Sequence, residues 1–115
     1  MSEFIFLYRS SETTVSPEQM QKTEEKWTVW CKELWANGHL KARGNPLERT
    51  GKVIKGRQKS ITDGPYAEVK DVVGGYTIIE VENITEAMEL AKGCPILDTG
   101  GSVEVRPVQN KGEKQ

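Results

Sequence analysis

The sequence predicts one α+β domain in which two helices pack on a sheet of extended segments. Residues 16–19 and 83–86 each combine an N-cap side chain with a glutamine or glutamate three residues later, which is typical of a helix start. Apolar residues recur at three- and four-residue spacing after both signals, whereas other segments alternate apolar and polar residues. With 115 residues, 36% of them hydrophobic and 29% charged, the chain has the size and composition of a single globular domain.

The first strand is expected over residues 3–9, whose side chains are apolar on both sides. This pattern indicates a central strand that is covered on both faces. The first helix should begin at Ser16, with Pro17 at its first position, and should end at Gly38, which can adopt a left-handed cap. Its predicted buried stripe consists of Met20, Thr23, Trp27, Trp30, Cys31 and Leu34.

The middle of the chain is expected to form shorter strands. One covers residues 39–45 and is broken by Pro46. Residues 47–55 and 57–62 are predicted to pair as an exposed polar hairpin around Lys55-Gly56.

A shaped loop is expected after the hairpin, over residues 62–70. Pro65 has no N–H to donate to a strand, and it restricts Gly64 before it to extended backbone. Loops held on a rigid scaffold often carry binding and catalytic side chains. We therefore expect the functional site at this loop.

The second half of the chain repeats the strand–helix–strand order. A strand is expected over residues 75–82, where one side carries Thr77, Ile79 and Val81. The second helix should follow its cap at Asn83 and end before Pro95. A last strand is expected over residues 102–108, and residues 109–115 form a polar tail beyond the domain at 1–108. The predicted buried stripe of the second helix consists of Ile84, Ala87, Met88 and Ala91.

This element order describes a ferredoxin-like α+β sandwich with an extra hairpin. Its two helices cover one face of the sheet and leave the other face apolar. We expect a second copy of the chain to cover that open face as a homodimer, which pairs the two sheets into a dimeric α/β barrel. The open face should carry Phe4, Tyr76 and Val103 or their neighbours.

Composition argues against several classes of function. The net charge of -1 argues against a general nucleic-acid or membrane-surface role, because both need a basic surface. Cys31 and Cys94 lack metal-ligand or disulfide spacing and are expected to be reduced thiols in a cytoplasmic protein. The amino terminus lacks the basic region and cleavage site of a signal peptide. We expect no metal and no cofactor.

Two long motifs resemble one known family. The segment 62–81, TDGPYAEVKDVVGGYTIIEV, resembles the signature of YCII-related proteins in the branch called DGPF-domain proteins, with Tyr66 where that branch usually has phenylalanine. The closing segment 100–108, GGSVEVRPV, is similar to the family's last strand. The opening FIFLYRS and the helix start SPEQM extend the resemblance over nearly the whole chain, to about residue 108.

The resemblance implies a dimeric α/β barrel with a cleft lined by the DGPF loop. Relatives of this fold include muconolactone isomerase-like enzymes, heme-degrading monooxygenases and dehalogenating YCII-like proteins. The family therefore implies a small-molecule-binding protein or enzyme. Many DGPF relatives are encoded beside alternative sigma factors, so the alternative is a non-catalytic accessory protein linked to sigma-factor-dependent transcription.

One departure from the family concerns the first helix. YCII proteins are thought to use a histidine on this helix together with a nearby aspartate. Here the single histidine, His39, follows the helix, and the corresponding helix region carries Glu24, Trp27 and Thr28.

Three candidate site residues lie in the loop. Asp63 is the candidate catalytic base or charged anchor, although an aspartate before Gly-Pro also serves to cap a turn. Tyr66 could donate to a ligand oxygen or pack as an anchor. Glu68 could complete a polar pocket, or could form a solvent-exposed ion pair with Lys70.

Three further ligand-binding candidates lie outside the loop. His39 could transfer a proton, but a histidine after a helix C-terminus also stabilises the helix dipole. Arg9, like Arg106, could bind a carboxylate or end a strand in solvent. Trp27 could form a wall of the cleft or belong to the core. The sequence leaves these alternatives open.

Overall fold

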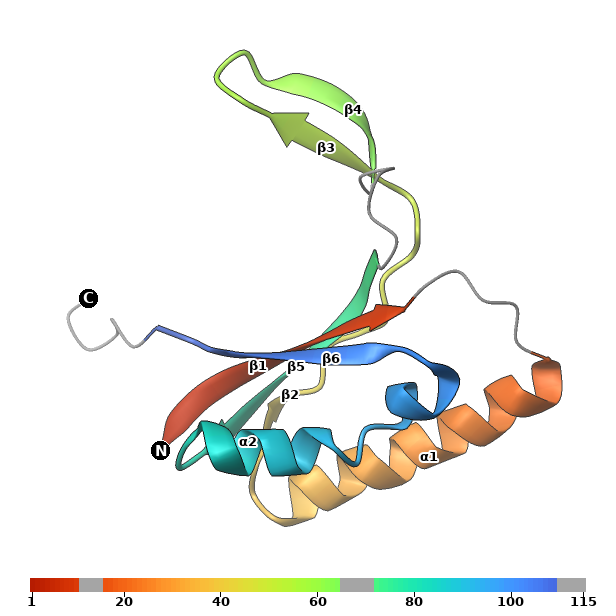
Figure 1. Ribbon diagram of the computed structural model, residues 1–115, viewed down its shortest axis with the longest axis vertical. Coiled ribbons are helices and arrows are strands. Elements are labelled where there is room, and N and C mark those ends of the chain that lie inside the picture. The colour runs from red at the N-terminus through yellow and green to blue at the C-terminus, as the bar shows by residue number, and fades with distance from the viewer. Residues whose placement is uncertain (11–15, 65–71, 110–115) are drawn as a thin grey trace.

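The computed structural model of the protein describes residues 1–10, 16–64 and 72–109. Figure 1 shows a twisted sheet, two helices on one side of it and a separate hairpin that projects away. In chain order the elements are β1 (Ser2–Ser10), α1 (Pro17–Ala36), β2 (Leu40–Ala42), β3 (Gly51–Lys55), β4 (Ser60–Gly64), β5 (Val72–Val81), α2 (Ile84–Ala91), the short 3-10 helix η1 (Pro95–Thr99) and β6 (Ser102–Pro107).

The main sheet has the strand order β2-β5-β1-β6, and each pair of neighbours is antiparallel. Both α1 and α2 cover the same face of this sheet (Figure 1). The predicted ferredoxin-like α+β sandwich is therefore confirmed. Strands β3 and β4 form their own two-stranded sheet, which confirms the extra hairpin.

The helix starts follow from their caps. The hydroxyl of Ser16 accepts a hydrogen bond from the Gln19 N–H at 3.1 Å, and the Asn83 side chain accepts from the Glu86 N–H at 3.0 Å. Each cap satisfies one of the N–H groups that have no partner within the helix. After α1, Gly38 takes a φ of 77°, the left-handed conformation expected for it.

The core lies between the helices and the helix-facing side of β1 and β5. Phe6, Ile79 and Val81 are fully buried there, and each contributes about 1.5–3 kcal/mol by burial. The predicted α1 stripe is confirmed at Trp30, Cys31 and Leu34. Its first residue, Met20, is instead 54% exposed. In α2 only the two alanines of the predicted stripe, Ala87 and Ala91, are buried.

The register of β1 corrects the expected open face. Phe4 pairs with Ile79 and Tyr8 with Val103, so Phe4 and Val103 share the helix-covered face. Since side chains alternate across a strand, the opposite face carries the other set. That open face has an apolar centre formed by Ile5, Leu7, Tyr76 and Ile78.

Ion pairs border this apolar centre. At one end Lys41 contacts the carboxylates of Glu3 and Glu80, and its hydrogen bond to Glu3 raises the pKa of the Lys41 ammonium group. At the other end the Arg9 Nε lies 3.1 Å from a Glu104 carboxylate oxygen. Within this single chain the outer side chains of β1 are only half-buried, so β1 is central in the sheet but open on one face.

The middle strands differ from the expected ones. Strand β2 covers three residues rather than seven, and a four-residue connection with positive φ at Gly56 and Lys59 joins β3 to β4. Asp63 and Gly64 belong to β4, where Asp63 pairs with Lys52, so the expected loop does not begin at residue 62. The remaining loop residues 65–70 lie outside the described ranges, as do tail residues 110–115. Across the described part of the chain, no helix combines the length and apolarity needed to cross a bilayer.

Candidate functional site

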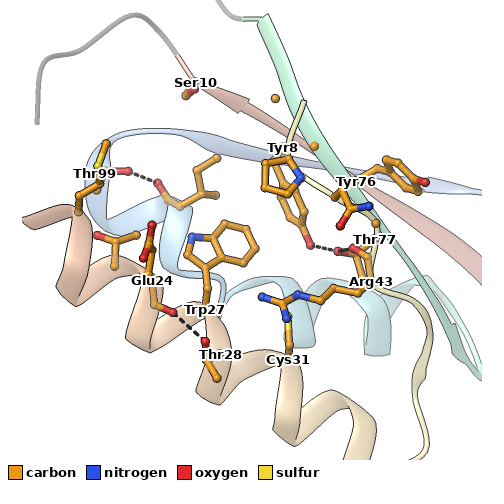
Figure 2. A pocket seen from close by; sticks show the side chains of 18 residues that line it. Tyr8, Ser10, Glu24, Trp27, Thr28, Cys31, Arg43, Tyr76, Thr77 and Thr99 are labelled. Carbon is orange, nitrogen blue, oxygen red and sulfur yellow. Dashed lines mark hydrogen bonds between the residues drawn. The ribbon is translucent and has the colours of Figure 1, made fainter. Parts of the chain in front are cut away.

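A cavity of about 540 Å³ lies between residues 20–31 of α1, the end of β1, the start of β5 and the segment after β2. Figure 2 shows its side chains. Its size falls within the usual range for small-molecule sites, about 300–1,000 Å³. Its lining includes Tyr8, Glu24, Trp27, Thr28, Arg43 and Thr77.

Helix α1 forms one wall of the cavity through a single face. Met20, Glu24, Trp27, Thr28 and Cys31 all line the cavity, and their three- and four-residue spacing places them on one side of a helix. The later residues of the same stripe, such as Leu34, lie in the core instead. One face of this amphipathic helix therefore lines the cavity as far as Cys31 and packs into the core through Trp30, Cys31 and Leu34.

Aromatic rings form the apolar part of the wall. The rings of Tyr8 and Trp27 meet edge to face, with centroids 4.8 Å apart and an interplanar angle of 82°. Trp30 packs edge to face against Trp27 with ring centroids 5.7 Å apart, and the Trp30 indole N–H donates to the Leu90 backbone carbonyl at 3.2 Å. Edge-to-face pairs of this kind add about 0.5–1.5 kcal/mol beyond area burial, so the wall is held in place before any ligand arrives.

A short hydrogen-bond chain crosses the floor of the cavity. The Tyr8 hydroxyl donates to the Thr77 hydroxyl oxygen at 2.6 Å, and the Thr77 hydroxyl donates to the Arg43 carbonyl at 3.0 Å (Figure 2). Burial raises the pKa of Tyr8 well above its usual range, an effect that the bond to Thr77 only partly offsets. Tyr8 is therefore neutral at physiological pH and acts as a hydrogen-bonded wall rather than as a phenolate base.

Two charged side chains reach the cavity from different elements. Arg43, directly after β2, extends toward Trp27 and Cys31 of α1, while Glu24 lies on the other side of Trp27 in the same view (Figure 2). Both residues line the cavity and remain exposed to solvent. Among the described residues, neither Arg43 nor Glu24 has an ion-pair partner. The cavity therefore presents one basic and one acidic group to a ligand.

The Cys31 thiol also lines the cavity. Burial raises the pKa of this thiol, and the nearby Arg43 charge offsets only part of that effect. A buried neutral thiol is a poor nucleophile, so Cys31 is part of the wall. No group of histidine, cysteine, aspartate and glutamate side chains within residues 1–10, 16–64 and 72–109 could hold a metal ion.

Gly44 lets the segment after β2 close over the cavity. Its φ is 71°, and a Cβ at this position would collide with the Tyr76 carbonyl oxygen. Only glycine permits both this backbone conformation and this close approach. The position of Arg43 beside the cavity therefore depends on the residue that follows it.

Of the residues predicted for the site, Trp27 lines this cavity. Asp63 lies instead on the projecting hairpin, where its carboxylate is 89% exposed and 2.5 Å from the Lys52 ammonium group. It does not line the cavity, and its proposed catalytic role stays a prediction. Tyr66 and Glu68 lie outside the described residues.

Arg9 and His39 lie away from the cavity. Arg9 pairs with Glu104 at the open face of the sheet. The His39 ring Nδ1 lies 3.2 Å from the Glu80 carbonyl oxygen, and the His39 backbone N–H donates to the Leu34 carbonyl at the end of α1. Their roles in ligand binding also stay predictions.

Sequence reasoning did not select Tyr8, Arg43 or Thr77. Thr77 carried a usable signal, because a hydroxyl on the apolar side of a strand needs a buried partner. Tyr8 carried a weaker one, as the only hydroxyl among the aromatic residues of β1. Arg43 carried none, because its position depends on how the segment after β2 crosses β5.

Comparisons with known proteins place the chain in a family. No curated protein matches it. One similar solved structure is 5-chloro-2-hydroxyhydroquinone dehydrochlorinase (TftG) from Burkholderia phenoliruptrix AC1100, in complex with 2,5-dihydroxybenzoquinone. That match covers 93% of each chain at 17% identity, with a TM-score of 0.48. The model of the YCII-related domain matches residues 2–110, so this chain belongs to the YCII-related domain family.

Proposed function

We propose that this protein binds a small organic molecule in the cavity between α1 and the sheet. The observation that carries the proposal is the lining itself, in which an aromatic wall is combined with a few polar groups from separate elements. Ligand sites in proteins usually have this composition, because the apolar wall supplies affinity and the polar groups fix orientation. We further propose that the chain belongs to the DGPF branch of the YCII-related family, which its motif at residues 62–81 resembles.

An open cavity supports binding over a purely accessory role. Protein interiors are close-packed, so an aromatic surface that core side chains leave unfilled favours a ligand-binding role. Here Trp27 is held to one side by Tyr8 and Trp30 instead of filling the space. The accessory role in sigma-factor-dependent transcription stays the alternative, and no feature of the described residues favours it.

Glu24 is the group best suited to proton transfer if the bound molecule is also turned over. It is the one carboxylate among the described residues that line the cavity, and it lies on α1, where the family resemblance places a histidine. A carboxylate can act as a general base when a ligand proton comes within hydrogen-bond distance.

A homodimer is part of this proposal. The open sheet face exposes an apolar centre around Leu7 and Ile78 that the chain itself does not cover. A two-fold axis through this face would bury the same patch on both copies. Sedimentation at micromolar concentration should give a dimer, and a stable monomer would contradict this part of the proposal.

Ligand binding is tested by a thermal-shift screen of metabolites against the purified protein. A ligand at 100 times its dissociation constant should add about 2.7 kcal/mol to the free energy of unfolding. The test variant is Trp27→Ala, which removes the aromatic wall, with Trp27→Phe as a variant that keeps a ring. Trp35→Ala is the matched control, because Trp35 lies on the same helix but is 71% exposed and does not line the cavity.

Trp27→Ala should abolish the ligand-induced shift, while Trp35→Ala should leave it unchanged. A screen without any stabilising ligand would contradict the proposal. So would a ligand whose dissociation constant is the same in the wild-type and Trp27→Ala proteins.

A further inference from the structure

We infer that the ligand of this cavity is an aromatic carboxylate that carries a hydrogen-bond donor, an amino or hydroxyl group, at the opposite end of its ring. The inference deepens the proposed function and rests on it, since it names the chemical class that the same cavity selects. Three features carry it: the basic group at one end, the acidic group at the other, and the aromatic wall between them.

The basic end is Arg43. Its side chain extends toward Trp27 and Cys31 (Figure 2), and within the described ranges no carboxylate forms an ion pair with it. The Arg43 backbone is held in place in two ways: the Thr77 hydroxyl donates to the Arg43 backbone carbonyl, and Gly44 lets the next segment pass close to Tyr76. A guanidinium group binds a carboxylate through two parallel N–H···O bonds, so an anion is the ligand group best matched to this end.

The acidic end is Glu24. Glu24 lies on the same face of α1 as Trp27 and Cys31, which follow it by three and seven residues. The Thr28 hydroxyl donates to the Glu24 backbone carbonyl at 3.0 Å, which leaves the Glu24 carboxylate available to a ligand. An ionised carboxylate only accepts hydrogen bonds. It would favour an amino or hydroxyl group of the ligand and repel a second anion.

The two charged groups flank one aromatic ring. Figure 2 shows Arg43 and Glu24 on opposite sides of Trp27, and Cys31, toward which Arg43 extends, follows Glu24 by seven residues, about 10 Å along the helix axis. A ligand ring that packs beside Trp27 would therefore meet Arg43 at one edge and Glu24 at the other. The edge-to-face pair of Tyr8 and Trp27 offers the apolar surface on which that ring would pack.

Four probes separate these contributions: 4-aminobenzoate, benzoate, benzamide and terephthalate. We expect 4-aminobenzoate to bind most tightly, benzoate less tightly, and neutral benzamide about tenfold more weakly than benzoate, which is the scale of one charge-assisted hydrogen bond. Terephthalate, with a second carboxylate facing Glu24, should bind more weakly than benzoate. Calorimetric titration of the wild-type protein measures this order.

Two variants should each remove one of these ligand preferences. Arg43→Gln should reduce the preference for benzoate over benzamide to about onefold, while Glu24→Gln should make terephthalate bind at least as tightly as benzoate. Arg57→Gln, on the hairpin, and Glu25→Gln, on α1 but outside the cavity lining, are the matched controls and should change neither preference. Retained thermal unfolding transitions show that the variants are folded.

The outcomes separate this inference from the proposed function. The inference is wrong if benzoate and benzamide bind equally, if Arg43→Gln keeps the anion preference, or if none of the four probes binds. In each of these cases a metabolite whose binding requires Trp27 would still uphold small-molecule binding. If no molecule binds in a Trp27-dependent way, both statements are wrong.

Discussion

The sandwich and the β3–β4 hairpin both carry isoleucine and valine in their strands, but these residues have opposite environments. In the sandwich, Phe6, Ile79 and Val81 are fully buried. In the hairpin, Ile54 and Ile61 are directly paired across the strands, yet they are 67% and 66% exposed. The hairpin projects away from both helices (Figure 1). The comparison shows that apolar residues in a strand are buried only where a second layer packs on them.

The two regions should therefore differ in how strongly a substitution lowers the free energy of unfolding. The sandwich gains its stability from two layers, whereas an isolated two-stranded hairpin is at best marginally stable in water. Contacts with the hairpin should therefore contribute little to the folding of the single chain.

Leu34→Ala should have the largest effect. Leu34 is 2% exposed and belongs to the core cluster under α1. Removing such a side chain leaves a cavity as well as losing burial, so the free energy of unfolding should fall by about 2–5 kcal/mol. Denaturant melts measure it, and a loss below about 1 kcal/mol would show that the second half of α1 is not part of the core.

Alkaline pH should weaken the sandwich. Burial raises the pKa of Cys94 from 9.0 to about 12, so between these values the folded chain keeps a proton that the unfolded chain releases. Stability from this group is full below pH 9 and is lost as pH rises, by about 1.4 kcal/mol per pH unit. The buried thiol of Cys31 and the hydroxyl of Tyr8 shift in the same direction.

Urea melts at pH 7, 9 and 10.5 measure this loss. Cys94→Ala lowers stability at every pH by leaving a cavity, so the readout is the slope with pH rather than the absolute value. The slope above pH 9 should become less steep in the variant. An unchanged slope would show that Cys94 does not cause the alkaline loss.

Ile54→Ala should cost no more than about 1 kcal/mol, which is the scale of one cross-strand pair. The physical reason is that its exposed side chain loses little burial when shortened. Val53→Ala, on the same strand but half-buried, is the neighbouring comparison. A loss of 2 kcal/mol or more for Ile54→Ala at micromolar concentration would break the contrast, because it would mean that another surface covers the hairpin in solution.

Asp63→Asn should have the smallest effect on stability. The Lys52–Asp63 ion pair is exposed on both sides, and such pairs contribute about 0–1 kcal/mol. The small loss should shrink further in high salt, because solvent ions screen exposed charges. Melts at low and high salt measure it. For function, an unchanged ligand dissociation constant in Asp63→Asn would remove Asp63 from the site, and a loss of binding with an intact fold would place it there.

Local chemistry made much of the fold predictable from the sequence. A cap at Ser16 or Asn83 needs only residues within one helical turn, and the alternation of Thr77, Ile79 and Val81 needs only a strand and one covered side. These signals predicted both helices, the strands β1, β5 and β6, the hairpin and the ferredoxin-like order. The long motifs predicted the YCII-related family, which the family model confirms.

The tertiary structure decided which side of each strand meets the helices and where the cavity opens. Phe4 and Val103 face the helices because the pairing register decides which alternate residues of a strand point to which face of the sheet. A register shift of one residue would move every side chain of the strand to the opposite face. Arg43 reaches the cavity because Gly44 lets the chain pass close to Tyr76, a contact between segments more than thirty residues apart. Such contacts depend on how distant segments pack, and no local pattern in a single sequence specifies them.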